Sequence, residues 1–94
     1  ARQINSLALV NDINLQLHVC GSPIATAAAL QFEAAMPNFL IHENHEITLK
    51  QAYRETLIKP LIAKNGVYEV STNAGLGVEL SDKARHNSEV IIVK

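Results

Sequence analysis

The pattern of apolar and polar positions predicts two extended segments on either side of a helix. Residues 13–18 read Ile-Asn-Leu-Gln-Leu-His, so the apolar side chains share one face and the polar side chains share the other. Residues 39–43, Phe-Leu-Ile-His-Glu, predict a second short strand that is apolar until its last residues. The Ala-rich run 24–36 lies between them and is apolar on most sides, which predicts a well-buried helix that ends at Pro37.

Ser22 and Pro23 suit the start of this helix. A serine side chain at the N-cap can accept from an orphan N–H, and a proline at the first position has no N–H to satisfy. A strand, a helix and a second strand in this order predict two parallel strands joined by a right-handed crossover. Parallel strands need cover on both faces, so the unit is expected to be part of a larger α/β sheet or barrel, and a closed barrel takes about 250 residues. A chain that starts at Ala1, at what reads as the last turns of a helix, agrees with that expectation.

Shorter elements are predicted outside this unit. The three aromatic and sulfur-containing residues of the central region, Phe32, Met36 and Phe39, are expected in the core. The remaining pattern predicts helices at 2–10 and 48–58, strands at 67–70 and 89–93, a glycine-punctuated loop at 74–78 and a helical turn at 81–85.

Composition excludes several classes of function. The chain has 94 residues, 48% of them hydrophobic, and a net charge of −1, which is typical of a soluble globular protein and offers no basic excess to attract nucleic acid. No apolar run approaches the roughly 20 residues that span a membrane, and residues 1–5 lack the order of a signal peptide. Cys20 is the single cysteine, which rules out an internal disulfide and fits a reducing cytosol. A small buried residue in the turn is favoured for it over a nucleophile beside His18.

His18 and Glu43 each end one of the two predicted parallel strands. The carboxyl ends of such strands carry the catalytic groups of α/β barrels and open α/β sheets. Neighbouring strands lie ~5 Å apart, so the two side chains can converge on one ligand. An imidazole exchanges protons near neutral pH, and a carboxyl group can hold a hydrogen bond to a substrate. On the residues alone, a catalytic pair and an ordinary hydrogen-bonded histidine beside a solvated glutamate both stay open.

A metal site is not predicted within these residues. The cluster His42, Glu43, His45 and Glu46 fails the zinc-protease pattern, because Glu46 occupies the position where the second histidine is needed. His42 and Glu43 also point to opposite faces of a strand. His45 is expected in the loop above the strand, near enough to the mouth of a pocket to be a candidate for substrate binding.

Two longer runs resemble a known family. Residues 18–31, His-Val-Cys-Gly-Ser-Pro-Ile-Ala-Thr-Ala-Ala-Ala-Leu-Gln, and residues 36–43, Met-Pro-Asn-Phe-Leu-Ile-His-Glu, resemble the seventh and eighth barrel strands of the mandelate racemase/muconate lactonizing enzyme branch of the enolase superfamily. Residues 74–80, Ala-Gly-Leu-Gly-Val-Glu-Leu, resemble the closing Pro-Gly-Leu-Gly-Val segment of that family, with Ala74 in place of proline. The chain is most similar to sugar-acid dehydratases of the galactonate and mannonate type.

The resemblance implies an α/β fold that is incomplete on its own. Residues 1–58 would be the last two strand–helix units of a TIM-type (β/α)7β barrel, and residues 59–94 a C-terminal tail that packs on the capping domain. It further implies a cytoplasmic lyase of carbohydrate acid metabolism that forms homo-oligomers and takes a small acid sugar as substrate, with no nucleic acid or membrane partner.

The implied reaction is a dehydration. A sugar acid bound to Mg²⁺ loses the proton alpha to its carboxylate and then a beta hydroxyl as water, which leaves a 2-keto-3-deoxy acid. His18 matches the acid/base histidine, and Glu43 matches the glutamate that hydrogen-bonds the carboxylate as it becomes an enediolate. The Mg²⁺ ligands would lie outside this segment, so the 94 residues alone are expected to be inactive. Racemase or cycloisomerase chemistry, or a small non-catalytic α/β binding module, are the alternatives.

Overall fold

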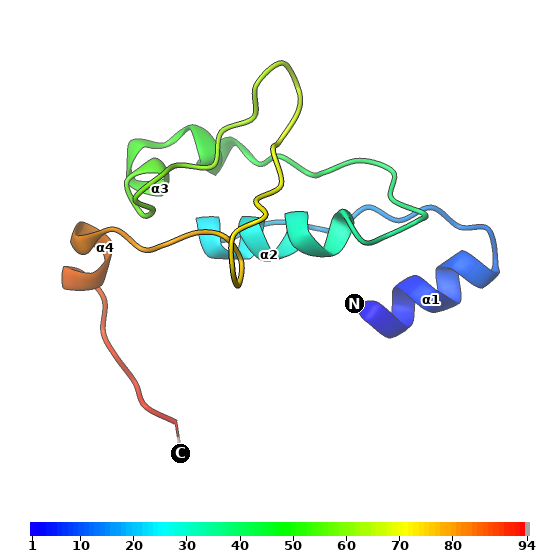
Figure 1. Ribbon diagram of the computed structural model, residues 1–94, viewed down its shortest axis with the longest axis horizontal. Helices are drawn as coiled ribbons and strands as arrows, with labels where there is room; N and C mark the ends of the chain where they lie inside the picture. The colour runs from blue at the N-terminus through cyan, green and yellow to red at the C-terminus, as the bar shows by residue number, and fades with distance from the viewer. Residues whose placement is uncertain (94) are drawn as a thin grey trace.

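The computed structural model describes residues 1–93, which form five short helices in an open arrangement. In Figure 1, α2 lies at the centre, α1 and α4 lie at opposite ends, and the last residues run away from the body. The Cα radius of gyration is 14.8 Å. The helices are α1 (Arg2–Val10), α2 (Pro23–Glu33), the 3-10 helix η1 (Glu46–Leu49), α3 (Gln51–Arg54) and α4 (Asp82–His86).

The two predicted extended segments lie side by side in parallel. Leu15 forms a parallel bridge with Phe39, and the Leu15 carbonyl accepts from the Leu40 N–H at 3.0 Å. The Leu15 N–H donates to the Asn38 carbonyl at 2.9 Å. The predicted parallel pairing on either side of α2 is therefore confirmed at this point, but among residues 1–93 it is a single bridge and not a pair of strands. An isolated pair of strands is only marginally stable, because each has one neighbour instead of two.

The start of α2 differs in detail from the prediction. Pro23 occupies the first turn as expected, but the Ser22 side chain makes no capping hydrogen bond, so that part of the prediction is wrong. The Ser22 carbonyl accepts from the Thr26 N–H at 3.2 Å instead. The helix ends at Glu33, and a turn carries the chain to Met36. The buried residues of α2 are Pro23, Thr26, Ala27, Ala29, Leu30 and Glu33.

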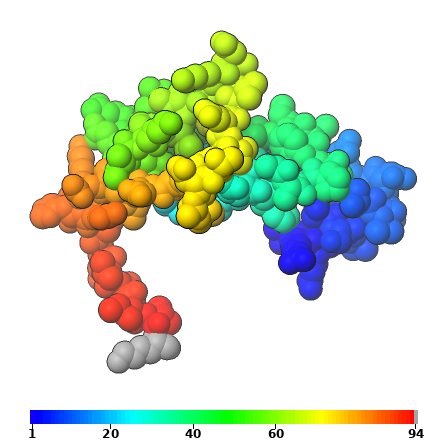
Figure 2. Space-filling view, in the orientation of Figure 1, coloured from blue at the N-terminus to red at the C-terminus, as the bar shows by residue number. Residues whose placement is uncertain are grey.

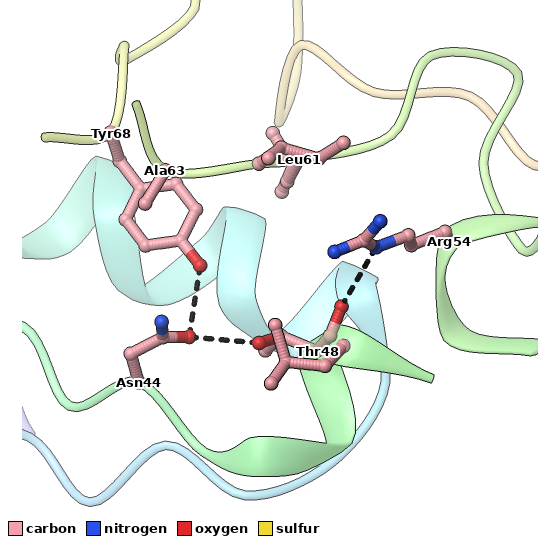
Figure 3. Close-up of a pocket in the computed structure, with 8 residues that line it drawn as sticks. Asn44, Thr48, Arg54, Leu61, Ala63 and Tyr68 are labelled. Carbon is pink, nitrogen blue, oxygen red and sulfur yellow. Dashed lines mark hydrogen bonds between the residues drawn. The ribbon is translucent and has the colours of Figure 1, made fainter. Parts of the chain in front are cut away.

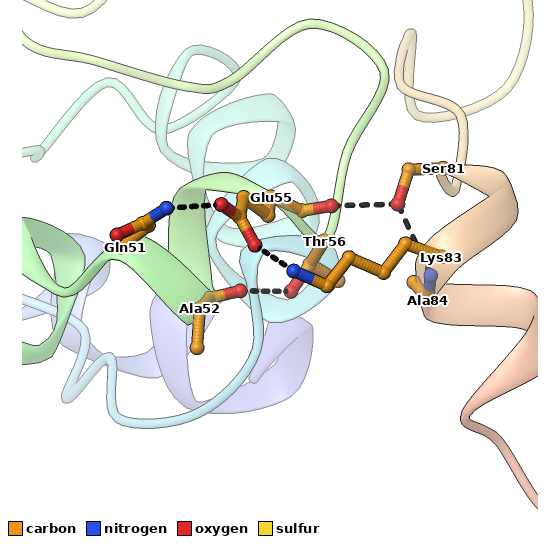
Figure 4. Close-up of polar contacts among 7 residues, drawn as sticks. All are labelled: Gln51, Ala52, Glu55, Thr56, Ser81, Lys83 and Ala84. Carbon is orange, nitrogen blue, oxygen red and sulfur yellow. Dashed lines mark hydrogen bonds and ion pairs between the residues drawn. The ribbon is translucent and has the colours of Figure 1, made fainter.

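Two hydrogen bonds and one bridge connect the elements of the second half of the chain. One hydrogen bond joins α3 to α2, and the other contacts join α3 and the residues after it to α4 and the residues before it. Thr26 Oγ1 and the Tyr53 hydroxyl share a buried hydrogen bond of 2.5 Å between α2 and α3. Leu57, which is 3% exposed, forms an antiparallel bridge with Leu80. Ser81 Oγ donates to the Glu55 carbonyl at 2.6 Å, which ties α4 to the end of α3 (Figure 4).

The helix predicted at 48–58 is wrong as a continuous element. Lys50 has extended dihedrals, φ −69° and ψ 139°, and it separates η1 from α3. The helical turn at 81–85 is confirmed as α4, where Ser81 Oγ accepts from the Ala84 N–H at 3.1 Å. The glycine-punctuated loop is also confirmed, because Gly75 and Gly77 take positive φ values of 66° and 72°.

The strands predicted at 67–70 and 89–93 are wrong. Val67 makes only a local bridge with Lys64, and residues 89–93 pair with no other described segment. Figure 2 shows the red C-terminal run standing clear of the rest of the molecule. A strand exists only by hydrogen bonding to a neighbour, and the apolar pattern of 89–93 finds none here.

Much apolar surface stays uncovered. Met36 is buried as predicted, whereas Phe39 is 42% exposed, so its prediction as a core residue is wrong. The reason is that no second layer of residues 1–93 covers this part of the extended pair. Exposed large apolar side chains gather on α1, on the extended segments and on the last residues: Ile4, Leu7, Val10, Ile13, Leu40, Ile41, Val90, Ile91, Ile92 and Val93. Within residues 1–93, every helix is too short or too polar to cross a membrane.

Candidate active site

The structure brings His18 and Glu43 together. His18 Nδ1 lies 3.0 Å from Glu43 Oε2, although 25 residues separate them in sequence. Leu15 and Phe39 form the parallel bridge. His18 lies three residues beyond Leu15, and Glu43 lies four residues beyond Phe39. Because the two segments run parallel, residues at these positions reach the same edge, the carboxyl ends of both segments.

The hydrogen bond leaves one nitrogen of His18 free for chemistry. A carboxylate that accepts from Nδ1–H fixes the tautomer in which Nε2 is an acceptor, and Nε2 can then take or return a proton. The His18 side chain is 79% exposed and that of Glu43 is 25% exposed. A contact of this kind at the surface contributes little to stability, since even a charged surface pair adds only about 0–1 kcal/mol. Stability therefore gives little reason for this arrangement, whereas proton transfer gives one.

A second histidine–carboxylate pair involves His42, the residue just before Glu43. His42 Nδ1 is 2.6 Å from Glu33 Oε2, and their side chains are only 11% and 4% exposed. The other carboxylate oxygen of Glu33, Oε1, has no hydrogen-bond partner among residues 1–93. Sequence reasoning missed this pair. A single carboxylate in an otherwise apolar, Ala-rich helix was the signal, since buried glutamates are rare unless they are paired.

A small hydrogen-bonded group follows directly after Glu43. Asn44 Oδ1 accepts from the Tyr68 hydroxyl and from Thr48 Oγ1, both at 3.0 Å, beside a cavity of about 130 Å³ (Figure 3). The Tyr68 ring meets the His42 ring edge-on, with centroids 5.1 Å apart and an interplanar angle of 72°. Burial raises the pKa of the Tyr68 phenol, and nearby Tyr53 raises it further.

A larger cavity of about 480 Å³ opens between α2 and the segment around Tyr68. Glu33, His42 and Tyr68 are among its lining residues. Neither His18 nor Glu43 lines this cavity or the smaller one. The His18 side chain is 79% exposed, so it stands at the surface of residues 1–93 and not in either cavity.

His45 and Cys20 were also singled out by the sequence. His45 is exposed, and its Nδ1 accepts from the Ile47 N–H at 3.2 Å, which caps η1. Within the described residues no hydrogen bond links it to His18 or Glu43, and its role in substrate binding stays a prediction. Cys20 is exposed, so the prediction that it is buried is wrong: the turn before α2 lies at the surface.

The described residues do not fit a metal site on their own. Across residues 1–93 no three or more His, Cys, Asp or Glu side chains cluster closely enough to hold a metal ion. The pair His18 and Glu43 offers one imidazole and one carboxylate. Mg²⁺ prefers an octahedron of oxygen ligands, which this pair cannot approach.

A parallel strand–helix–strand unit with an imidazole and a carboxylate at its carboxyl edge is typical of one part of an α/β barrel enzyme. Residues 1–84 match the family described as enolase C-terminal domain-like, and the chain belongs to that family.

Three relatives illustrate the similarity. D-galactarolactone cycloisomerase of Agrobacterium fabrum is 31% identical over 90 residues, which are 88% of this chain and 24% of that protein. D-xylonate dehydratase of Haloferax volcanii is 36% identical over 80 residues, 84% of this chain and 19% of that protein. The crystal structure of an enolase superfamily member from Salmonella Typhimurium is 43% identical with a TM-score of 0.89, over 99% of this chain and 24% of that one. The chain thus spans a quarter or less of the length of these proteins.

Proposed function

We propose that this chain is the C-terminal part of a sugar-acid dehydratase of the enolase superfamily. The observation that carries the proposal is the 3.0 Å hydrogen bond between His18 and Glu43 at the carboxyl edge of two parallel segments. The 36% identity to a D-xylonate dehydratase supports a sugar acid as the substrate class.

In the proposed reaction the substrate loses the proton alpha to its carboxylate and then its beta hydroxyl. His18 Nε2 takes the alpha proton and then returns it to the departing hydroxyl, which leaves as water, and the product is a 2-keto-3-deoxy acid. The proton on Nδ1 and the Glu43 carboxylate keep that ring in the required tautomer. When Glu43 itself carries a proton, it donates a hydrogen bond to the substrate carboxylate as this becomes an enediolate.

The rest of the proposal concerns the place of this chain in a larger protein. Residues 1–58 are the end of a barrel, and residues 59–94 form a tail that packs on a capping domain. The uncovered apolar side chains of α1 and of residues 90–93 support such packing, because large exposed apolar patches are typical of interaction surfaces. Dependence on Mg²⁺, with ligands from outside this segment, a homo-oligomer and a cytoplasmic location belong to the same proposal.

A second candidate is cycloisomerisation of a sugar lactone. The 31% identity to a D-galactarolactone cycloisomerase favours it, and an imidazole that moves a proton alpha to a carboxyl group serves both reactions. The two candidates differ in product, since only dehydration releases water and yields a 2-keto-3-deoxy acid.

The test is a substrate screen on the complete protein that contains this chain. Pentonates, hexonates, aldarates and their lactones are offered with Mg²⁺, and 2-keto acids are detected as semicarbazones. We expect dehydration of at least one acid, and a loss of about 10²- to 10⁴-fold in kcat/KM for His18→Asn. His86→Asn, a substitution of the same kind at an exposed histidine of α4, is the control and keeps full activity.

Two outcomes would count against the dehydratase. Conversion of lactones without any 2-keto acid selects the cycloisomerase. No conversion of any compound, together with cooperative unfolding of the isolated 94 residues, selects a small independent binding module.

A further inference from the structure

We propose that Glu33, His42 and Tyr68 are positioning residues that set the direction of the Glu43 side chain toward His18. This inference rests on the proposed function, since it assigns a supporting role within the same site.

The first step is the alternation of side chains along the segment 39–43. Consecutive side chains on an extended backbone point to opposite faces. His42 is bound to Glu33 of α2 on one face, and Glu43 is bound to His18 on the other. Fixing the rotation of the segment at His42 therefore also fixes the direction in which Glu43 leaves the backbone.

The second step concerns the other neighbour of Glu43. Asn44 is held by the Tyr68 hydroxyl at 3.0 Å, and the same tyrosine ring packs edge-on against His42. Both neighbours of Glu43 are thus held in place. His42 is held by the Glu33 carboxylate on α2, and Tyr68 contacts both His42 and Asn44. We call the contacts of Glu33, His42 and Tyr68 the anchor. It joins α2, the segment 39–44 and the stretch around Tyr68 next to Glu43.

The third step is the contrast in burial between the two pairs. The Glu33 and His42 side chains are 4% and 11% exposed, whereas His18 is 79% exposed. Loss of one partner from a buried pair disturbs its surroundings far more than loss from an exposed pair, because the remaining group stays without water or a partner. The buried pair of Glu33 and His42 can therefore keep the segment 39–43 in place. The exposed His18 and Glu43 can each replace the other by a substrate as hydrogen-bond partner.

The experiment compares Glu33→Gln with Glu33→Leu in the complete enzyme. Glutamine keeps an oxygen that accepts from His42, whereas leucine has a similar size and no acceptor. We expect Glu33→Leu to lower kcat about 10- to 100-fold with little change in KM, as when a group that orients a catalytic residue is lost. Glu33→Gln should keep most of the activity. Glu69→Leu, at an exposed glutamate, is the control for the substitution itself.

Tyr68→Phe tests the same anchor with a smaller change. It keeps the ring against His42 and removes only the hydrogen bond to Asn44, so we expect a smaller loss of kcat than in Glu33→Leu. If Glu33→Leu does not fold, Glu33→Gln, Tyr68→Phe and His42→Gln give the comparison. A lower Tm with unchanged kcat in all folded variants would mean that the cluster is merely structural, and the inference would be wrong.

Failure of the proposed function is distinguished by a second readout. If the wild-type enzyme converts no sugar acid, crystal structures of the wild type and the variants still decide the inference. We expect the His18–Glu43 hydrogen bond to be kept in Glu33→Gln and lost in the folded variants without the Glu33 acceptor or the His42 imidazole. An unchanged pair in all of them overturns the inference.

Discussion

His18 Nδ1 and Glu43 Oε2 lie within hydrogen-bond distance, 3.0 Å, across 25 residues of sequence. The parallel pairing of Leu15 with Phe39 creates this contact, since it aligns the ends of both segments at one edge. Side chains in such contact usually act as a unit, so the effects of their substitutions are not independent.

The first prediction concerns this coupling. In the complete enzyme we expect His18→Asn and Glu43→Leu each to lower kcat/KM strongly, and the double variant to be about as impaired as the worse single variant. The reason is that His18→Asn removes the imidazole and Glu43→Leu removes its acceptor, so each substitution already disables the pair. Steady-state kinetics of all four enzymes measures this, and losses that simply multiply would contradict it.

The second prediction concerns the buried hydrogen bond between Thr26 and Tyr53. Tyr53→Phe leaves the Thr26 hydroxyl buried without this partner, and we expect a loss of about 1–3 kcal/mol in the free energy of unfolding. The double variant Thr26→Val, Tyr53→Phe replaces both polar groups by apolar ones and should recover part of that loss. Urea or thermal unfolding of the complete protein measures the difference. A double variant no more stable than Tyr53→Phe would argue against a paired role for the two hydroxyls.

The third prediction compares two glycines of the closing loop. Both have positive φ, which costs about 1–2 kcal/mol for an L side chain. A Cβ at Gly77 would also collide with the side chain of Ser71, whereas a Cβ at Gly75 meets nothing within 4 Å. Gly77→Ala should therefore lower the Tm more than Gly75→Ala, and Ser71→Gly should reduce the difference. Equal shifts in Tm for both alanine variants would contradict the contact with Ser71.

The fourth prediction concerns acid stability. Hydrogen bonds from Lys83 and Gln51 lower the pKa of Glu55 below its ordinary value of 4.5 (Figure 4). As the pH falls, the Glu55 carboxylate is therefore protonated in the unfolded chain before it is protonated in the folded chain. The contribution of Glu55 to the free energy of unfolding is thus present above pH 4.5, and it is lost as the pH falls from 4.5 through the lowered pKa of the folded state. Lys83→Met should flatten this part of the profile of Tm against pH. Lys59→Met, at an exposed lysine, is the matched control and should leave the profile unchanged.

Local sequence was sufficient for elements that depend on near neighbours. The helix at Arg2–Val10 and the start of α2 at Pro23 follow from apolar spacing and from the fixed φ of proline. The meeting of His18 and Glu43 also followed, because period-2 alternation and a helical crossover fix which residues end two parallel strands.

Contacts between elements could not be read in the same way. Glu33 and His42 meet only because α2 docks on the segment 39–43, and Tyr68 reaches both His42 and Asn44 only because a later stretch folds back over them. Nothing in the local pattern fixes those distances.

The sequence by itself determined the helical crossover, the edge at which His18 and Glu43 stand and the loop around Gly75 and Gly77. Tertiary structure alone decided that residues 89–93 form no strand among the described residues, that Cys20 is exposed and that Glu33 is buried against His42. The physical reason is that helices satisfy their hydrogen bonds within the segment, whereas strands, burial and buried ion pairs depend on which distant segments pack alongside.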